Sequence, residues 1–108
     1  MSLTRQDIME IKVDGKLIPL NDYVKNFVRN IILGILDSLK GIPETRQQIS
    51  LKINGEGGCT LSVQEKKIPI NRFVRNIVAN VVQAIVSSLK DVPKNPKKVE
   101  IYLNDFRE

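Results

Sequence analysis

Few side chains in this sequence could perform catalysis. It contains no histidine, so it lacks the most common general base, the most common metal ligand and any Ser-His or Cys-His nucleophile pair. The acidic residues are scattered, and none of them form a set at the spacing of a metal site. We expect Cys59, the single cysteine, to be a small hydrophobic residue of a strand, since no basic neighbour lowers its pKa. We therefore expect no enzyme, no catalytic residue, no metal ion and no cofactor.

Four asparagines form the first candidate interaction site. They occur in two pairs, each spaced by about one helical turn at the border of an apolar stretch: Asn26 with Asn30, and Asn76 with Asn80. Asparagine is a poor helix former, so its repeated use inside expected helices needs a reason. One interpretation is hydrogen bonding to a loop or a strand edge, and the other is a polar rim on a binding interface.

A basic patch forms the second candidate site. It combines the loop before the last expected strand with the adjoining helix: Arg72, Arg75, Lys90, Lys94, Lys97 and Lys98. A solvated surface is one interpretation, and contact with the phosphates of a nucleic acid is the other. The net charge of +5 is only mildly basic. Tyr102 is the single aromatic residue that we expect to be exposed on a strand, so the platform used by single-strand binders is missing. We expect such binding to be weak and salt-dependent.

A stretch that occurs twice must position both sites. Residues 19–40 and 69–90 match at an offset of 50 without a gap, and the match extends to the strands on either side. We interpret the chain as one domain, residues 1–108, made of two repeats at about 7–54 and 57–104. Two copies cannot close a ring of repeats, so we expect internal pseudo-twofold symmetry.

Turn signals set the strands. Asp14-Gly15 between apolar runs predicts a hairpin with a type I′ turn. Gln64-Glu65 stands at the matched place and tolerates positive φ poorly, so we expect a longer turn or another type there. The glycine-rich segment 54–58 is too short for a parallel crossover, and it predicts that strand 47–54 lies antiparallel to strand 59–64.

The helices begin at clear caps. Asn21 and Asn71 occupy the expected N-cap positions, and the helices run on towards Lys40 and Lys90, with Gly41 as a C-cap in the first copy. Apolar pairs recur every four residues and cover an arc of roughly 220°. That arc is about twice what a surface helix needs, so each helix should be covered on two sides.

Small residues interrupt the apolar arc of each helix. Gly34 and Ser38 lie one turn apart, and Ala84 and Ser88 repeat this spacing. A tight fit over the sheet is one interpretation of this small-residue lane. The other is a crossing of the two helices at the lane.

These patterns predict an α+β fold with an internal duplication of a β-β-α-β repeat. The two long helices should pack on one face of a six-stranded mixed sheet. The run from Ile18 to Gly41, with Ile-Pro-Leu-Asn, Ile-Leu-Gly and Ser-Leu-Lys-Gly, resembles small uncharacterised archaeal proteins. The resemblance implies no activity.

Function is predicted mainly by exclusion. We expect a non-enzymatic structural or protein-interaction module that forms a homo-oligomer such as a homodimer, with another protein as a possible partner. The alternative is a weak nucleic-acid-binding protein that uses the basic loop 90–98. No membrane association is expected, since the longest apolar run, Ile31 to Leu36, is too short to span a bilayer. The polar start of the chain does not match a signal peptide, so we expect a cytoplasmic protein.

Overall fold

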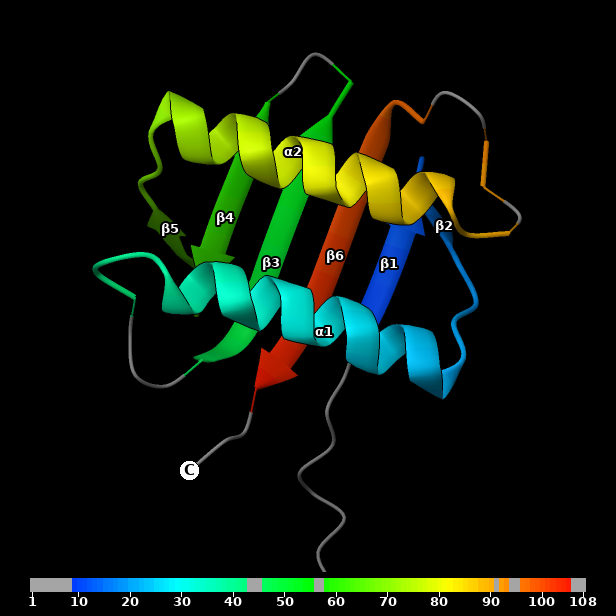
Figure 1. The fold of residues 1–108 in the computed structure, drawn as a ribbon, viewed down its shortest axis with the longest axis horizontal. Helices are drawn as coiled ribbons and strands as arrows, with labels where there is room; N and C mark the ends of the chain where they lie inside the picture. Colours follow the sequence, from blue (N-terminus) through cyan, green and yellow to red (C-terminus); the bar gives the residue numbers. More distant parts are fainter. Residues whose placement is uncertain (1–8, 43–45, 56–57, 91, 94–95, 106–108) are drawn as a thin grey trace, which may run out of the picture.

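The computed structural model describes residues 9–42, 46–55, 58–90, 92–93 and 96–105. Lys94 of the basic patch lies outside these residues. The described elements follow one another in this order (Figure 1): β1 Met9–Val13, β2 Lys16–Leu17, α1 Asp22–Asp37, β3 Arg46–Asn54, β4 Cys59–Val63, β5 Lys66–Ile68, α2 Arg72–Ser87 and β6 Lys98–Asp105.

The fold is α+β, but the expected mixed sheet is wrong. The six strands are ordered β2-β1-β6-β3-β4-β5, and each described pairing is antiparallel. β1 and β3 run in the same direction and would make a parallel pair if they were neighbours. β6 lies between them and pairs with both, so the last strand of the second half completes the sheet of the first half. The expected antiparallel pairing of β3 with β4 is confirmed.

The central pair of strands joins the two halves of the chain. β3 pairs with β6 so that Leu51 lies opposite Ile101, the residue fifty positions later. Ile49 and Ile53 lie opposite Leu103 and Val99, and these side chains are almost completely buried. The two halves therefore share one hydrophobic core.

Both edge hairpins use two-residue turns. Asp14 and Gly15 have φ values of +50° and +84°, as the predicted type I′ turn requires. Gln64 and Glu65 have φ values of +54° and +64°, so the expectation of a longer or different turn was wrong. β4 pairs with β5 in the register that brings Val63 opposite Lys66, and this register leaves room for two residues only. Burial along the strands therefore overrides the poor turn propensity of the sequence.

The helix N-termini agree with the prediction. The side chains of Asn21 and Asn71 accept hydrogen bonds from the backbone N–H groups of Val24 and Val74, each at 2.8 Å. The C-termini do not agree, because α1 ends at Asp37 rather than at Lys40, and α2 ends at Ser87.

Both helices end in a tightened last turn that contains a serine. Ser38 donates its hydroxyl to the carbonyl of Gly34 at 3.1 Å, and Ser88 donates to that of Ala84 at 2.9 Å. The backbone N–H of Ser38 donates to the carbonyl of Ile35, only three residues back, and such a bond tightens the last turn of α1. Gly41 has the expected positive φ of +80°, but it lies beyond the helix.

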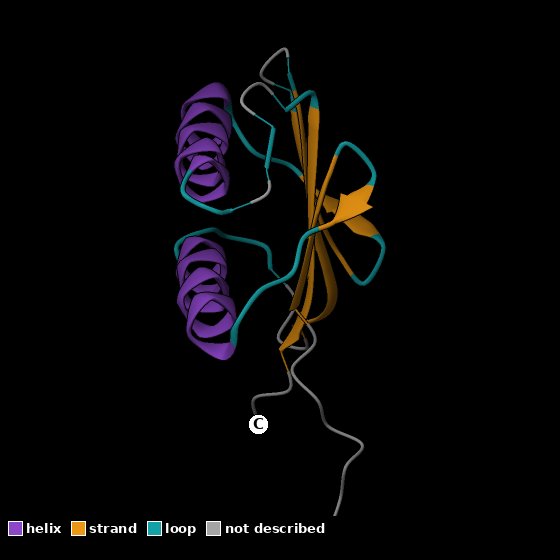
Figure 2. Ribbon diagram, turned by 90° about the vertical axis from the view of Figure 1, so that its right-hand side faces the viewer, coloured by secondary structure: helices purple, strands orange, loops and turns teal. Residues whose placement is uncertain are grey.

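Both helices lie on the same side of the sheet (Figure 2). They run side by side in opposite directions across the strands (Figure 1). Their buried residues join the strand residues in one core: Val28, Ile32, Leu33 and Leu36 of α1, with Val78, Val82 and Val86 of α2. The opposite face of the sheet is not covered by either helix.

Both interpretations of the small-residue lane were wrong. Gly34, Ser38, Ala84 and Ser88 are exposed, and a Cβ added at Gly34 would meet nothing within 4 Å. At about 100° per residue these positions lie opposite the buried stripe, so the lane points away from the sheet. The helices also do not cross there, because they lie side by side (Figure 1).

Candidate interaction surface

Exposed large hydrophobic side chains gather on the helices. Five are exposed among the described residues, and they are Leu17 (53%), Tyr23 (75%), Phe27 (55%), Phe73 (69%) and Ile77 (44%). Four of them form two pairs, one in the first half of each helix at matched positions, and the two members of a pair lie about one turn apart. The rings of Tyr23 and Phe27 stack with centroids 6.3 Å apart. The wide apolar arcs predicted that each helix is buried on two sides. In this chain the sheet buries one side of each helix, and the opposite side is exposed.

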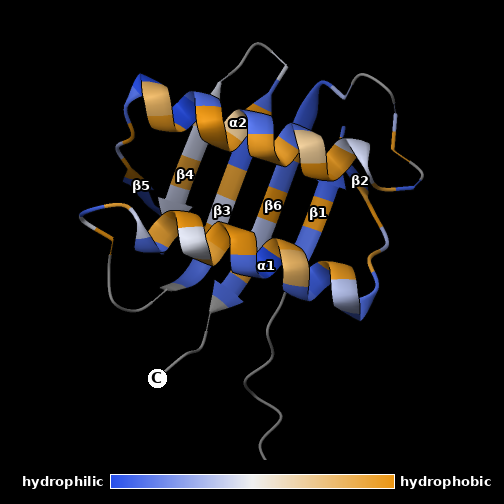
Figure 3. Ribbon diagram, in the orientation of Figure 1, coloured by the Kyte–Doolittle hydropathy of each residue, from blue (hydrophilic) through white to orange (hydrophobic). Residues whose placement is uncertain are grey.

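These side chains and the small-residue lane share one surface. Counted at about 100° per residue, both lie on the side of each helix opposite the buried stripe. We call this surface the outer helix face, and it consists of Tyr23, Phe27, Gly34 and Ser38 of α1 and Phe73, Ile77, Ala84 and Ser88 of α2. Hydrophobic residues recur along the whole length of both helices (Figure 3). The first half of each helix is bulky on this face, and the second half is small.

The four candidate asparagines border the outer helix face. Asn26, Asn30, Asn76 and Asn80 are all exposed on the helices. Asn30 and Asn80 each fall between the bulky and the small part of the face, and Asn26 and Asn76 lie on its flank. Their position fits the polar rim that was one of the two interpretations.

The basic patch is divided. Arg72 and Arg75 lie in the first turn of α2, whereas Lys90 follows its last turn. The sixteen residues of α2 span about 24 Å, since a helix rises about 1.5 Å per residue. Lys97 and Lys98 lie exposed at the start of β6. The structure therefore does not bring the described members of the patch to one place.

Tyr102 lies on the sheet face that the helices leave open, and it has partners there. Its hydroxyl donates a 2.7 Å hydrogen bond to Glu100, and the Lys12 amine lies 5.9 Å from the centre of its ring. The hydrogen bond to Glu100 raises the pKa of Tyr102 to about 12. The same bond lowers the pKa of Glu100, with further help from Lys98, whose amine is 3.9 Å away. The ring is half-buried, which limits its use as a stacking platform.

Cys59 shows no sign of activation. Burial raises the pKa of its thiol, and the positive charge of Arg75 opposes this shift to a smaller extent. Arg75 is a basic neighbour that the sequence did not predict, because it lies on a different element. A raised pKa leaves less thiolate at neutral pH, so the expectation of an unreactive side chain fits this environment.

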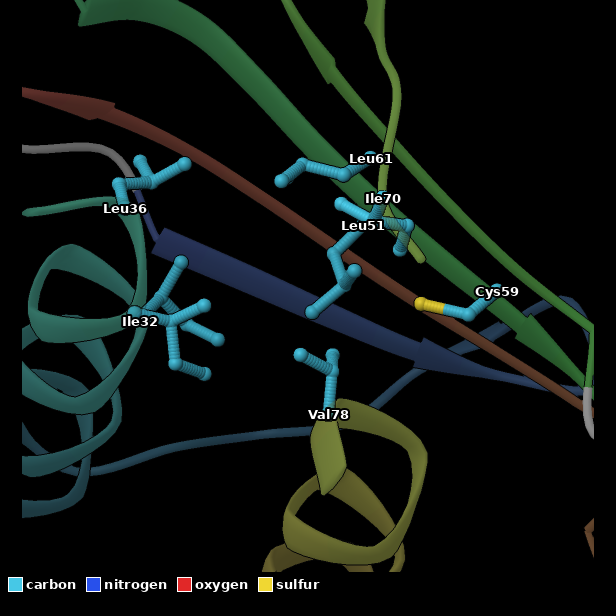
Figure 4. A pocket seen from close by; sticks show the side chains of 8 residues that line it. Ile32, Leu36, Leu51, Cys59, Leu61, Ile70 and Val78 are labelled. Carbon is cyan, nitrogen blue, oxygen red and sulfur yellow. The ribbon is translucent and has the colours of Figure 1, made fainter. Parts of the chain in front are cut away.

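A small gap lies between the helices and the sheet, and side chains from both line it (Figure 4). It measures about 10 Å³ and is lined by apolar side chains around Cys59, including Ile32, Leu51 and Val78. Small-molecule sites usually enclose about 300 Å³ or more. Two larger depressions are open to solvent. One of about 330 Å³ lies where β3 begins and β6 ends, beside Gln48 and Asn104, and one of about 610 Å³ lies at the β4–β5 edge, beside Thr60 and Lys67.

The described residues hold neither a cluster of metal ligands nor a helix that could cross a membrane. No three His, Cys, Asp or Glu side chains within that part of the chain are grouped so that they could hold a metal ion. Neither α1 nor α2 has the length and apolar character that crossing a bilayer demands.

Comparisons with family models, with curated proteins and with solved structures found no match. The resemblance to small archaeal proteins therefore stays an expectation from the sequence.

Proposed function

We propose that the chain is a non-enzymatic protein-interaction module that associates with copies of itself through the outer helix face. The exposure of Tyr23, Phe27, Phe73 and Ile77 at matched places on two helices carries this proposal. Each helix thus exposes a pair of large hydrophobic side chains, and grouped exposed hydrophobic residues mark protein contacts more often than single ones do. Full burial of a large hydrophobic side chain gains roughly 1.5–3 kcal/mol, so four of them supply a useful part of a binding free energy.

The proposal includes an origin by internal duplication with pseudo-twofold symmetry, and a cytoplasmic location. The equal order of elements in residues 9–54 and 59–105 supports the duplication. The antiparallel pairing of β3 with β6 supports the duplication as well. Leu51 lies opposite Ile101, and a twofold axis between these two residues would exchange the two halves.

Weak nucleic-acid binding stays the alternative. It has less support, because the basic residues are separated along α2 and the ring of Tyr102 is half-buried beside Lys12.

Light scattering of two matched variants tests the proposal. Phe27→Lys places a charge on the outer helix face, and Leu17→Lys places one at an equally exposed position on β2. At about 50 µM the unmodified protein and Leu17→Lys should form the same oligomer, and Phe27→Lys should be a monomer. A monomeric unmodified protein at that concentration would contradict the proposal. An oligomer that Leu17→Lys disrupts and Phe27→Lys does not would move the contact to another surface.

A further inference from the structure

The depression of about 610 Å³ at the β4–β5 edge of the sheet is lined by an unusual set of side chains. We call it the edge depression. Its volume is within the range of small-molecule sites. The lining combines apolar Ile68, Pro69 and Ile70 with two cations, Lys67 and Arg75, and no described acidic residue lines it. The edge depression therefore offers an apolar surface beside two positive charges.

The two cations reach the edge depression from opposite faces of the sheet. Lys67 lies opposite Ser62 of β4, and its neighbour Ile68 is buried in the core, so Lys67 points to the open sheet face. Arg75 comes from α2 on the covered face and is half-buried. Neither cation forms an ion pair with a described carboxylate. An anion at this edge would thus meet two positive charges that no described acidic side chain neutralises.

A backbone N–H group also points to this edge. The N–H of Asn54 donates to the carbonyl of Gly58, and hydrogen-bonded pairs alternate along an antiparallel ladder, so the backbone groups of Cys59 point away from β3. On that side, β5 pairs with β4 only as far as Leu61, so no described strand pairs with Cys59 there. The two cations and this N–H are donors of the kind that a carboxylate or phosphate accepts.

The matched place in the first half lacks this chemistry. Fifty residues before Thr60, Lys67 and Arg75 stand a carboxylate, an apolar side chain and one cation: Glu10, Leu17 and Lys25. The charges of that carboxylate and that cation cancel, whereas two positive charges remain at the edge depression. Met9 stands at the place of Cys59 and is 5% exposed, whereas the smaller Cys59 is only half-buried. The second half is therefore both more open and more positive at this edge.

We propose that the edge depression binds a small organic anion, with a carboxylate or a phosphate on a short apolar body. The anionic group lies between Lys67 and Arg75 and accepts a hydrogen bond from the N–H of Cys59. The guanidinium of Arg75 suits both kinds of anion, because each can accept two parallel hydrogen bonds from it. The apolar body packs on Pro69 and Ile70. This site does not depend on self-association, because none of its residues belongs to the outer helix face.

An NMR titration of the unmodified protein with three probes tests the site. Hexanoate and hexyl phosphate present the two anionic groups, and hexylamine presents a positive charge on the same apolar body. We expect both anions to cause saturable shifts of the Cys59 amide signal, and hexylamine to cause none. The anion with the lower Kd identifies the preferred head group.

Two variants at matched helix positions distinguish a specific site from attraction to the net charge. Arg75→Gln should raise the Kd of the tighter anion by about tenfold, because a charge-assisted contact is lost. Lys25→Gln removes the same charge from an equally half-buried position on α1, and it should change Kd by less than about twofold. Glutamine is about as good a helix former as arginine or lysine, so both variants should keep the fold. Lys67→Leu should raise Kd by less than Arg75→Gln does, because Lys67 is exposed.

Three results would overturn the proposal. The first is the absence of a saturable shift with either anion, and the second is an equal shift with hexylamine. The third is an equal rise of Kd in Arg75→Gln and Lys25→Gln, because it would mean that the anions respond to the net charge of the protein and not to this site.

Discussion

Backbone N–H groups near the starts of the two central strands, β3 and β6, donate hydrogen bonds to different kinds of side chain. Near the start of β6, Asp14 accepts hydrogen bonds from the backbone N–H groups of Lys97 and Lys98, at 2.8 and 2.9 Å. At the matched place in β3, the N–H of Gln48 donates to the side chain of Asn104 at 2.5 Å. A backbone donor needs an acceptor, but several neighbours can supply it. In both halves, therefore, the backbone N–H groups at this place are hydrogen-bonded, but the side chains that accept the bonds differ.

The edge turns give a second contrast. Asp14-Gly15 suits positive φ, whereas Gln64-Glu65 adopts it against its preference. The two turns are equal in backbone and unequal in sequence. The register of the buried strands therefore decides the turn, and the second half stores some strain there.

The largest expected effect concerns the shared core. Leu51→Ala and Ile101→Ala should each lower the free energy of unfolding by about 2–5 kcal/mol, because both side chains are buried at the centre of the sheet. The two losses should not add, since the residues lie opposite each other. Urea denaturation at one fixed protein concentration measures this. A loss below about 1 kcal/mol in either variant would mean that the halves do not share one core.

The next largest effect on stability concerns the hydrogen bonds that Asp14 accepts near the start of β6. Asp14→Gly keeps positive φ accessible and removes the acceptor for two N–H groups, so we expect a loss of about 1–2 kcal/mol. Asp14→Asn retains an acceptor oxygen, and its loss should stay below about 0.5 kcal/mol. Equal losses in the two variants would show that the negative charge, and not the pair of hydrogen bonds, is what matters.

The turns should respond in opposite directions to a swap. Glu65→Gly should raise the free energy of unfolding by about 1 kcal/mol, because glycine adopts the observed φ of +64° without strain. Gly15→Glu should lower it by a similar amount, because φ is +84° there. Thermal unfolding of the pair measures both signs. Destabilisation by Glu65→Gly would contradict the strain that we assign to the second turn.

The smallest effect lies on the open sheet face. Tyr102→Phe should cost about 0.5–1 kcal/mol at neutral pH, because its hydrogen bond to Glu100 is lost. In the unmodified protein, Tyr102 keeps its proton up to about pH 12, whereas an unfolded tyrosine loses it near pH 10. Its contribution is therefore complete below pH 10 and is lost as the pH rises towards 12. The phenylalanine variant should lack this part of the alkaline loss.

An acid titration checks the same bond from the other side. The hydrogen bond from Tyr102 lowers the pKa of Glu100, so its contribution is present above the normal glutamate range and is lost as the pH falls through the lowered value. Tyr102→Phe should raise the pKa of Glu100, measured by NMR. An unchanged value would mean that the neighbouring lysines cause the shift.

Local patterns in the sequence were sufficient to predict the helix starts and two of the turns, but not which strands lie next to each other in the sheet. The asparagine caps, the Asp14-Gly15 turn and the hairpin at 54–58 each depend on a few adjacent residues, and all three are present. The antiparallel sheet was missed because the insertion of β6 between β1 and β3 depends on contacts between residues far apart in the chain. The helix ends were missed because the last turns tighten at Ser38 and Ser88, where the backbone bonds reach three residues back, and the positive φ of Gly41 comes only after that turn.

The candidate surface was predicted in part. The asparagine positions and the wide apolar arcs led to the helices, but the arc alone did not distinguish the covered side from the exposed side. Its width could not reveal that Gly34 faces solvent. Arg72 and Lys90 were predicted to form one patch because the loop and the helix adjoin in sequence, but the length of α2 separates them.

Hydroxyl-radical footprinting of the unmodified protein over a concentration series tests the central claim most directly. The outer helix face should be free at low concentration and covered by a second copy at high concentration. We predict that Tyr23, Phe27 and Phe73 lose reactivity as the concentration rises, while Leu17, which is similarly exposed on β2, does not. Constant reactivity of the three aromatic residues, or protection of Leu17 alone, would contradict the account.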